Sequence, residues 1–234
     1  MVADAVIYHP TVAHWLKFTA TTAGRDKLLR TIQYFSRFYA WYLFRTNNPA
    51  ATIKPFEAAK KQLGIARKLL RVGKFLEHLK AAATAADAKG LDPVLRYCAV
   101  GRQIGYAGYL TLDNICVLDV AGIRPLANAK RLQREAAKFW LSGLTFNTIA
   151  GLYTLYVLRQ RAAAVDKKEG EGAVESKKIE REWNATSLQL AQDMCDICLP
   201  STSLGLLNLD DGLVGIAGTV SSLLGVYSVW KKTA

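Results

Sequence analysis

The hydrophobic and polar positions of residues 60–86 repeat with the period of an α-helix. The apolar side chains that fall on one face are Ile65, Leu69, Val72, Phe75, Leu76, Leu79 and Ala83. The basic residues of the stretch, most of them off that face, are Lys60, Lys61, Arg67, Lys68, Arg71, Lys74 and Lys80. This pattern is typical of a helix lying on an anionic membrane. It is also found in bundle helices that have a solvated basic face, so the pattern alone leaves both readings open.

Two further stretches carry no charge. Residues 139–158 lie between Lys138 and Arg159, and residues 212–230 lie between two aspartates and two lysines. About 20 apolar residues span a bilayer as a helix, so both stretches are predicted membrane spans. Trp140 and Tyr156 lie near the ends of the first, as interfacial aromatic residues do. A buried core helix is the alternative for each stretch.

The rest of the chain shows helical signals and no strand periodicity. Helices are expected over residues 10–24, 25–44, 55–89 and 92–122, and from residue 125. Residues 159–182 are charged and contain glycine, so an exposed loop is expected there. A helix should follow and end at residues 200–203, PSTS.

These elements predict an all-α integral membrane protein with an interfacial amphipathic helix and about two spans. The predicted regions are a cytosolic or interfacial part (1–138), the spans, a charged loop with an amphipathic helix (159–211), and a basic tail (231–234).

Charge limits the partners of the protein. The net charge is +12, and residues 1–138 hold 22 Lys and Arg against 9 Asp and Glu. A basic surface attracts nucleic acid or anionic lipid. No nucleic-acid-binding motif is present, and the amphipathic pattern lies on the basic half, so we expect anionic lipid and no nucleic acid.

Candidate catalytic chemistry is sparse. Cys195 and Cys198 have C-x-x-C spacing without a βαβ context or further ligands nearby, which favours two ordinary helical cysteines over a redox or zinc site. There is no phosphate loop, nucleotide fingerprint or nucleophile elbow. We therefore expect no enzyme activity, no metal and no cofactor.

Small residues repeat at a spacing of four in the last uncharged stretch. Ala217, Ser221 and Gly225 form a face that permits close helix contact, so it is the predicted self-association face. Gly101, Gly105 and Gly108 offer a second face of this kind.

Three stretches together resemble the peroxin-eleven family in its fungal form. These are GRDKLLRTIQYFSRFYAWYL near the N-terminus, the basic amphipathic stretch, and RQIGYAGYLTLDNICVLDVAGI over residues 102–123. The resemblance implies a peroxisomal membrane protein that elongates and divides peroxisomes by inserting an amphipathic helix into the cytosolic leaflet. It also implies homo-oligomers that work with a dynamin-type GTPase and its tail-anchored adaptor.

Two other functions stay open. A pore for small metabolites would place polar residues such as Asn147 along a path, and a soluble helical scaffold would not need the spans. For a membrane protein, the basic residues beside the spans, Lys130, Arg131, Arg134, Lys138, Lys231 and Lys232, predict that both termini face the cytosol and that residues 159–211 face the lumen.

Overall fold

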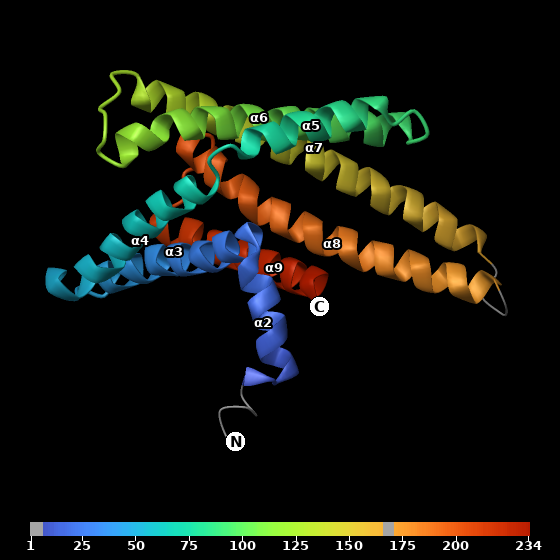
Figure 1. Ribbon diagram of the computed structural model, residues 1–234, viewed down its shortest axis with the longest axis horizontal. Coiled ribbons are helices and arrows are strands. Elements are labelled where there is room, and N and C mark those ends of the chain that lie inside the picture. The colour runs from blue at the N-terminus through green and yellow to red at the C-terminus, as the bar shows by residue number, and fades with distance from the viewer. Residues whose placement is uncertain (1–6, 166–170) are drawn as a thin grey trace. The chain divides into compact units, whose positions relative to one another are not determined.

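The computed structural model describes residues 7–165 and 171–234, and every regular element in these ranges is helical. Figure 1 labels the helices, which are α2 (Pro10–Ala20), α3 (Thr22–Arg45), α4 (Ala50–Leu70), α5 (Lys74–Asp87), α6 (Pro93–Val120), α7 (Ala129–Ala164), α8 (Glu171–Leu204) and α9 (Asp211–Thr233). The chain divides into two compact units, one formed by residues 1–71 with 208–234 and the other by residues 72–207. The all-α prediction is confirmed for the described residues.

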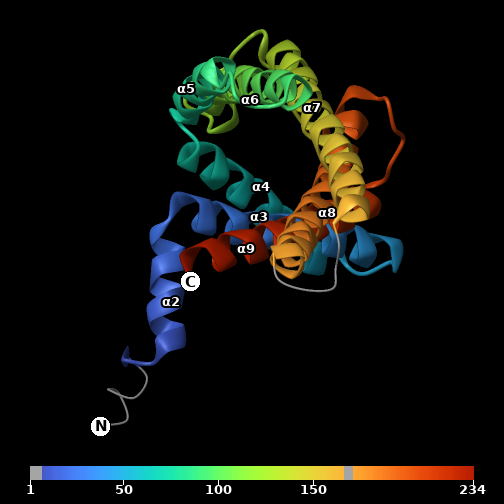
Figure 2. The ribbon, with the colours of Figure 1, turned by 90° about the vertical axis from the view of Figure 1, so that its right-hand side faces the viewer.

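The first unit is built on α3, which packs against both α4 and α9 (Figure 2). The Thr21 hydroxyl caps the start of α3 by accepting a hydrogen bond from the Gly24 amide at 2.9 Å. Asn47 ends the helix in the left-handed region at φ 55°, and the Asn48 amide bonds the Leu43 carbonyl. The chain then reverses through Pro49 into α4.

Glycines of α9 let it lie close against the aromatic face of α3. Gly212, Gly215 and Gly218 face Trp41, Phe38 and Tyr34 in that order, so the two helices are antiparallel. A Cβ atom at Gly215 would lie 2.6 Å from the Phe38 backbone nitrogen, which is too close for any side chain. The aromatic residues of α3 are therefore partly used inside the unit.

The second unit is a set of antiparallel helices in which α5 packs on α6, α6 on α7 and α7 on α8. Asp92 caps α6 by accepting bonds from the Val94 and Leu95 amides, as predicted. Close contact between α6 and α7 depends on Gly105, where a Cβ atom would lie 2.7 Å from the Cα atom of Gly143. The glycine face of α6 is thus used within the chain.

The predicted continuous helix over residues 60–86 is wrong. The structure divides the stretch into the end of α4 and α5, with a turn between Leu70 and Lys74. Gly73 lies in this turn at φ 80°, a left-handed conformation that glycine adopts without steric cost. Amphipathic periodicity continues across the glycine, which is why the pattern concealed the break.

Two predicted breaks are also wrong. α7 continues to Ala164 and α8 begins at Glu171, so most of the expected loop over residues 159–182 is helical; residues 166–170 lie outside the described residues. Ala, Arg, Lys and Glu favour helix, and Arg161 pairs with Glu175 and Glu182 across the two helices. Pro200 is fully buried inside α8, which continues to Leu204.

Candidate membrane-binding surface

Helix α5 turns an apolar face outward. Leu76 and Leu79 are 60% and 49% exposed, and Ala83 is exposed beside them. The opposite face packs on α6, where the His78 imidazole stacks on Tyr106 with ring centroids 5.4 Å apart. His78 Nδ1 also lies 2.6 Å from the side-chain Oε1 atom of Gln103. A helix of a water-soluble bundle places leucine inward, whereas α5 exposes Leu76 and Leu79 beside Glu77 and Lys80 and packs His78 on α6. Exposed leucines beside charged residues suit a lipid surface.

The other predicted inserting residues divide between exposed and half-buried positions. Leu69 lies on α4 and Val72 in the turn, and both are exposed. Ile65 on α4 and Phe75 on α5 are half-buried. The exposed members of the set are therefore Leu69 in the first unit and Val72, Leu76 and Leu79 in the second.

Arg67 does not belong to the predicted basic face. Its side chain is buried, with 7% of the residue exposed. Its Nε atom donates to Asp26 at 3.1 Å and its Nη1 atom to Gln33 at 2.7 Å, both on α3. Burial alone would raise the pKa of Asp26, but Arg67 and Arg71 hold it below its ordinary value. Arg67 therefore joins α4 to α3 and is not available to a lipid headgroup.

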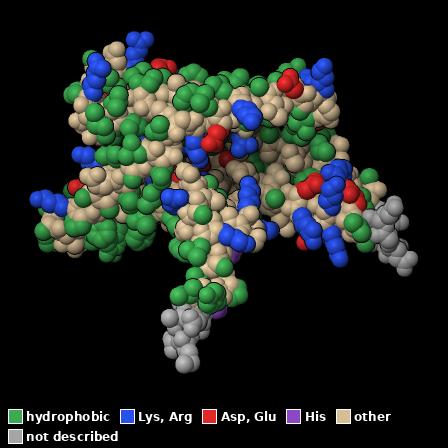
Figure 3. Space-filling view, in the orientation of Figure 1, with side chains coloured by type: hydrophobic (Ala, Val, Ile, Leu, Met, Phe, Trp, Pro, Cys, Tyr) green, Lys and Arg blue, Asp and Glu red, His purple; other side chains and the backbone are tan. Residues whose placement is uncertain are grey.

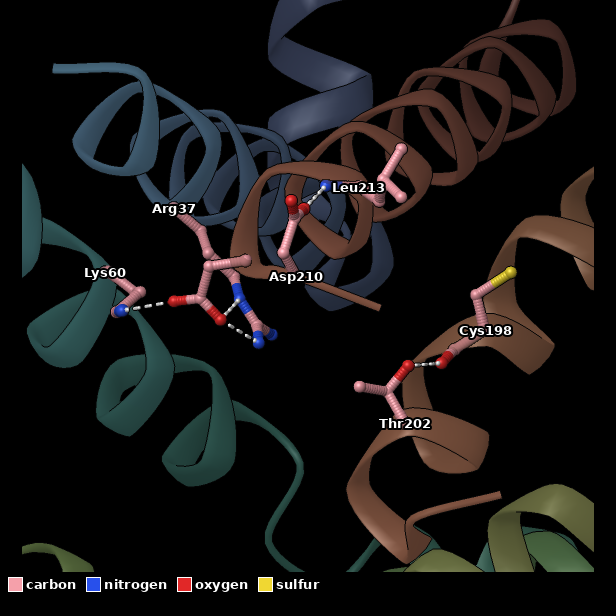
Figure 4. Close-up of polar contacts among 7 residues, drawn as sticks. Arg37, Lys60, Cys198, Thr202, Asp210 and Leu213 are labelled. Atoms are coloured by element: carbon pink, nitrogen blue, oxygen red, sulfur yellow. Dashed lines mark hydrogen bonds and ion pairs between the residues drawn. The ribbon is translucent and has the colours of Figure 1, made fainter. Parts of the chain in front are cut away.

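The remaining basic residues differ in access. Lys61 and Lys80 are exposed, whereas Lys68, Arg71 and Lys74 are half-exposed. Lys60 pairs with Asp211 at 3.3 Å, and Arg37 donates to the same carboxylate at 2.6 Å (Figure 4). Lys61 and Lys80 are thus the most accessible cations of the predicted lipid-binding set.

The predicted self-association face of α9 packs inside the first unit. Ser221 is fully buried and Gly225 lies against the Lys27 side chain, while Ala217 is half-buried. The outward face of α9 is instead an apolar stripe at helical spacing, formed by Leu213, Ile216, Val220, Leu223 and Tyr227. Sequence reasoning missed α3 as the partner, although the aromatic residues Tyr34, Phe38 and Trp41 also recur at helical spacing.

This packing predicts different effects for two glycines. Gly215→Ala should lower the stability of the protein by about 1–3 kcal/mol because its Cβ atom would overlap the backbone of α3. Gly225→Ala should change it by less than about 0.5 kcal/mol, because the flexible end of Lys27 can move away. Thermal unfolding in detergent would measure both variants, and equal losses would contradict the α3–α9 packing.

Within the part of the chain that the structure describes, two helices, α7 and α9, are long and apolar enough to cross a membrane, as the sequence predicted. On α7 the exposed apolar residues include Ile149, Leu152 and Tyr156. Asn147, in the middle of the uncharged run, donates to the buried carboxylate of Asp193 on α8. Polar groups therefore face the interior of the helix pair while apolar groups face outward.

Hydrophobic side chains cover much of the visible surface of both units (Figure 3). Within the described residues, no group of three or more His, Cys, Asp and Glu side chains could hold a metal ion. Cys98, Cys116, Cys195 and Cys198, all among the described residues, are not joined in disulfides. The prominent surface feature is thus apolar area on helices that also carry cations.

An all-helical chain with two candidate spans and outward apolar faces has the character of a membrane protein. The family model "Peroxisomal biogenesis factor 11 (PEX11)" matches residues 12–230, so the chain belongs to this family. It is 32% identical to peroxisomal membrane protein PMP27 of Saccharomyces cerevisiae over the full length of both chains.

Other relatives agree. The chain is 30% identical to peroxisomal membrane protein PMP30B of Candida boidinii, covering 100% of this chain and 99% of the relative. It is 22% identical to human peroxisomal membrane protein 11B, covering 92% and 95%. No solved structure gives a significant match. The resemblance read from the sequence is confirmed, and the relatives support a peroxisomal membrane location.

Proposed function

We propose that this protein bends and elongates the peroxisomal membrane by inserting the apolar face of α5, with Val72 just before it, into the cytosolic leaflet. The observation that carries the proposal is the outward position of Leu76 and Leu79, opposite the packed side chain of His78. Side chains buried at headgroup depth expand one leaflet and leave the other unchanged, which favours curvature. Membership of a peroxisomal biogenesis family supports the same function.

Exposed cations would attract α5, and separately α4, to an anionic surface. Lys61 and Lys80 are exposed, and each well-placed cation contributes about 1 kcal/mol of attraction to such a surface. Lys68, Arg71 and Lys74 add to this from half-exposed positions. In this proposal α7 and α9 anchor the protein, so the wedge stays concentrated at the membrane.

Self-association would raise the local density of wedges, and we propose it as part of the mechanism. The small-residue faces of α6 and α9 pack within the chain, so the contact must use another surface. A dynamin-type GTPase and its tail-anchored adaptor are the proposed partners for the division step, on the ground of the family resemblance.

The test is reconstitution of the full-length protein into anionic vesicles, imaged by electron microscopy. Tubules that form in proportion to bound protein would support the wedge. A pore is the alternative, favoured by the Asn147–Asp193 pair inside a candidate span. Efflux of a small trapped solute from vesicles that stay spherical would support the pore and count against the wedge.

The topology proposed for the wedge places the N-terminal part and α5 in the cytosol. Two spans then return the C-terminus to the cytosol, and the four basic residues before residue 139 support that orientation.

The packing of α8 favours a second arrangement. Asp193 meets Asn147 at mid-span, so α8 would run back beside α7 through the membrane. The six residues between α8 and α9 reach at most about 20 Å, which is less than the roughly 30 Å of a bilayer core. In this arrangement α9 would therefore begin on the side where α8 ends, and the C-terminus would face the lumen.

Protease treatment of intact peroxisomes should separate the arrangements. With two spans, a tag at the C-terminus is removed and a tag inserted at Gly170 is protected. If α8 also crosses, both tags are protected. Loss of the Gly170 tag with protection of the C-terminal tag would contradict both arrangements and would leave α5 on the wrong side for a cytosolic wedge.

A further inference from the structure

A groove with one charged end lies along the first half of α7. It has a volume of about 460 Å³, within the range of small-molecule sites. Its lining residues on α7 are Arg134, Lys138, Leu141, Ser142, Thr145 and Phe146. Leu204 and Leu206, from the end of α8, line it as well. The α7 residues recur every three or four positions, so they form one helical face about 18 Å long.

The turn after α8 places the leucines of this groove. Gly205 has φ 78°, and the Leu206 amide bonds the Ser201 carbonyl at 2.9 Å. This is the bonding of a Schellman motif, which ends a helix with a fixed backbone path. Leu206 is 65% exposed although it lines the groove, so its apolar surface is open to an occupant.

Charge and apolar surface are separated along the groove. Arg134 and Lys138 stand at the end that precedes the uncharged run of α7, and Leu141, Phe146 and Leu206 follow. The Glu135 carboxylate lies beside these cations and pairs with Lys138 at 2.7 Å. In a helix that crosses the membrane, the end of the charged segment lies at headgroup depth. An occupant must therefore carry an anion at that depth and an apolar chain beyond it.

We propose that this groove binds one anionic phospholipid of the surrounding bilayer, with its headgroup on Arg134 and Lys138 and an acyl chain along Leu141, Phe146 and Leu206. Basic pockets beside membrane helices suit anionic headgroups. The inference rests on the proposed arrangement in which α7 and α8 both cross the membrane, because two spans alone would leave Leu204 and Leu206 on the lumenal side, away from Arg134 and Lys138. It does not rest on insertion of α5. Through this site the protein would respond to the anionic phospholipid content of the membrane, in addition to bending it.

The test is photolabelling of the full-length protein in phosphatidylcholine vesicles that contain phosphatidylserine with a diazirine on its acyl chain. We expect labelled peptides from residues 141–146 or 204–206, and weaker labelling there by phosphatidylcholine carrying the same diazirine. The Arg134→Gln/Lys138→Gln variant should reduce phosphatidylserine labelling at these peptides about thirtyfold, since each of the two cations contributes about 1 kcal/mol.

The chain offers a matched control and a variant with increased labelling. Lys130→Gln/Arg131→Gln removes the same charge from exposed positions of α7 that do not line the groove, so labelling should persist. Glu135→Gln releases Lys138 and should increase labelling, a result that misfolding cannot produce. Ser142→Phe should reduce it by filling the groove.

Equal losses in the two double variants, or equal labelling by both lipids, would overturn the site. Replacing Leu76 and Leu79 by Glu should leave the groove labelling unchanged, so failure of the wedge and failure of this site are distinguishable. Loss of groove labelling in that variant would contradict an independent site.

Discussion

Leu76→Glu/Leu79→Glu is expected to abolish the formation of tubules by the full-length protein on anionic vesicles. The two leucines are 60% and 49% exposed, so the substitution removes little packing from the second unit. Fully burying a leucine side chain contributes about 1.5–3 kcal/mol, and a carboxylate opposes both burial and the anionic surface. The loss of 3 kcal/mol or more corresponds to at least about a hundredfold weaker binding by this helix.

The matched control is Lys89→Glu, which changes the net charge by the same amount at an exposed position just after α5. It should still form tubules. Sedimentation with vesicles and electron microscopy would measure binding and shape, and circular dichroism would show that α5 remains helical. Tubules formed by the leucine variant at wild-type protein density would remove α5 as the bending element.

The sequence predicted the helices whose ends carry local signals. Asp92 and Pro93 start α6, and Asp210 caps the start of α9, so both of these helix starts could be placed without a structure. These signals act within one turn of the helix. Breaks that depend on tertiary packing were less predictable. Pro200 is accommodated inside α8, and Gly73 divides a stretch that keeps its periodicity on both sides.

The candidate surface was predicted in part. A helical wheel identifies Leu76 and Leu79 as one face, but it cannot tell whether that face points to protein or away from it. The structure shows that this face is exposed, and that His78 instead contacts Gln103 and stacks on Tyr106 of α6. Similarly, Ser221 and Gly225 were predicted to face a second protomer, and α3 of the same chain meets them instead. Which element a helix face packs against depends on long-range contacts, and residue spacing carries no information on them.

Arg67 shows that the sequence also cannot tell which basic residue of a stretch is buried in an ion pair. From the sequence it is one of seven basic residues in a lipid-binding stretch, equivalent to its neighbours. In the structure it is the buried one, and Asp26 and Gln33 on α3 neutralise and orient it. Their positions, about 40 residues earlier in the chain, carry no local signal of the pairing.

Arg67→Ala is therefore expected to destabilise the first unit and not simply to weaken lipid binding. Removing one partner of a buried ion pair leaves the carboxylate of Asp26 without its main counter-charge, a loss of about 3–5 kcal/mol. Lys61→Ala removes the same charge six residues earlier at an exposed position, and its effect on stability should stay within about 0.5 kcal/mol.

Thermal unfolding in detergent would rank the two variants, and vesicle binding by the fraction that remains folded would separate stability from lipid attraction. We expect Arg67→Ala to lower the unfolding midpoint strongly while its folded fraction binds anionic vesicles nearly as well as wild type. Lys61→Ala should show the opposite pattern, with normal unfolding and weaker binding. An unchanged unfolding midpoint for Arg67→Ala, together with reduced binding, would indicate that Arg67 contacts lipid as the sequence predicted. That result would contradict its burial between α4 and α3.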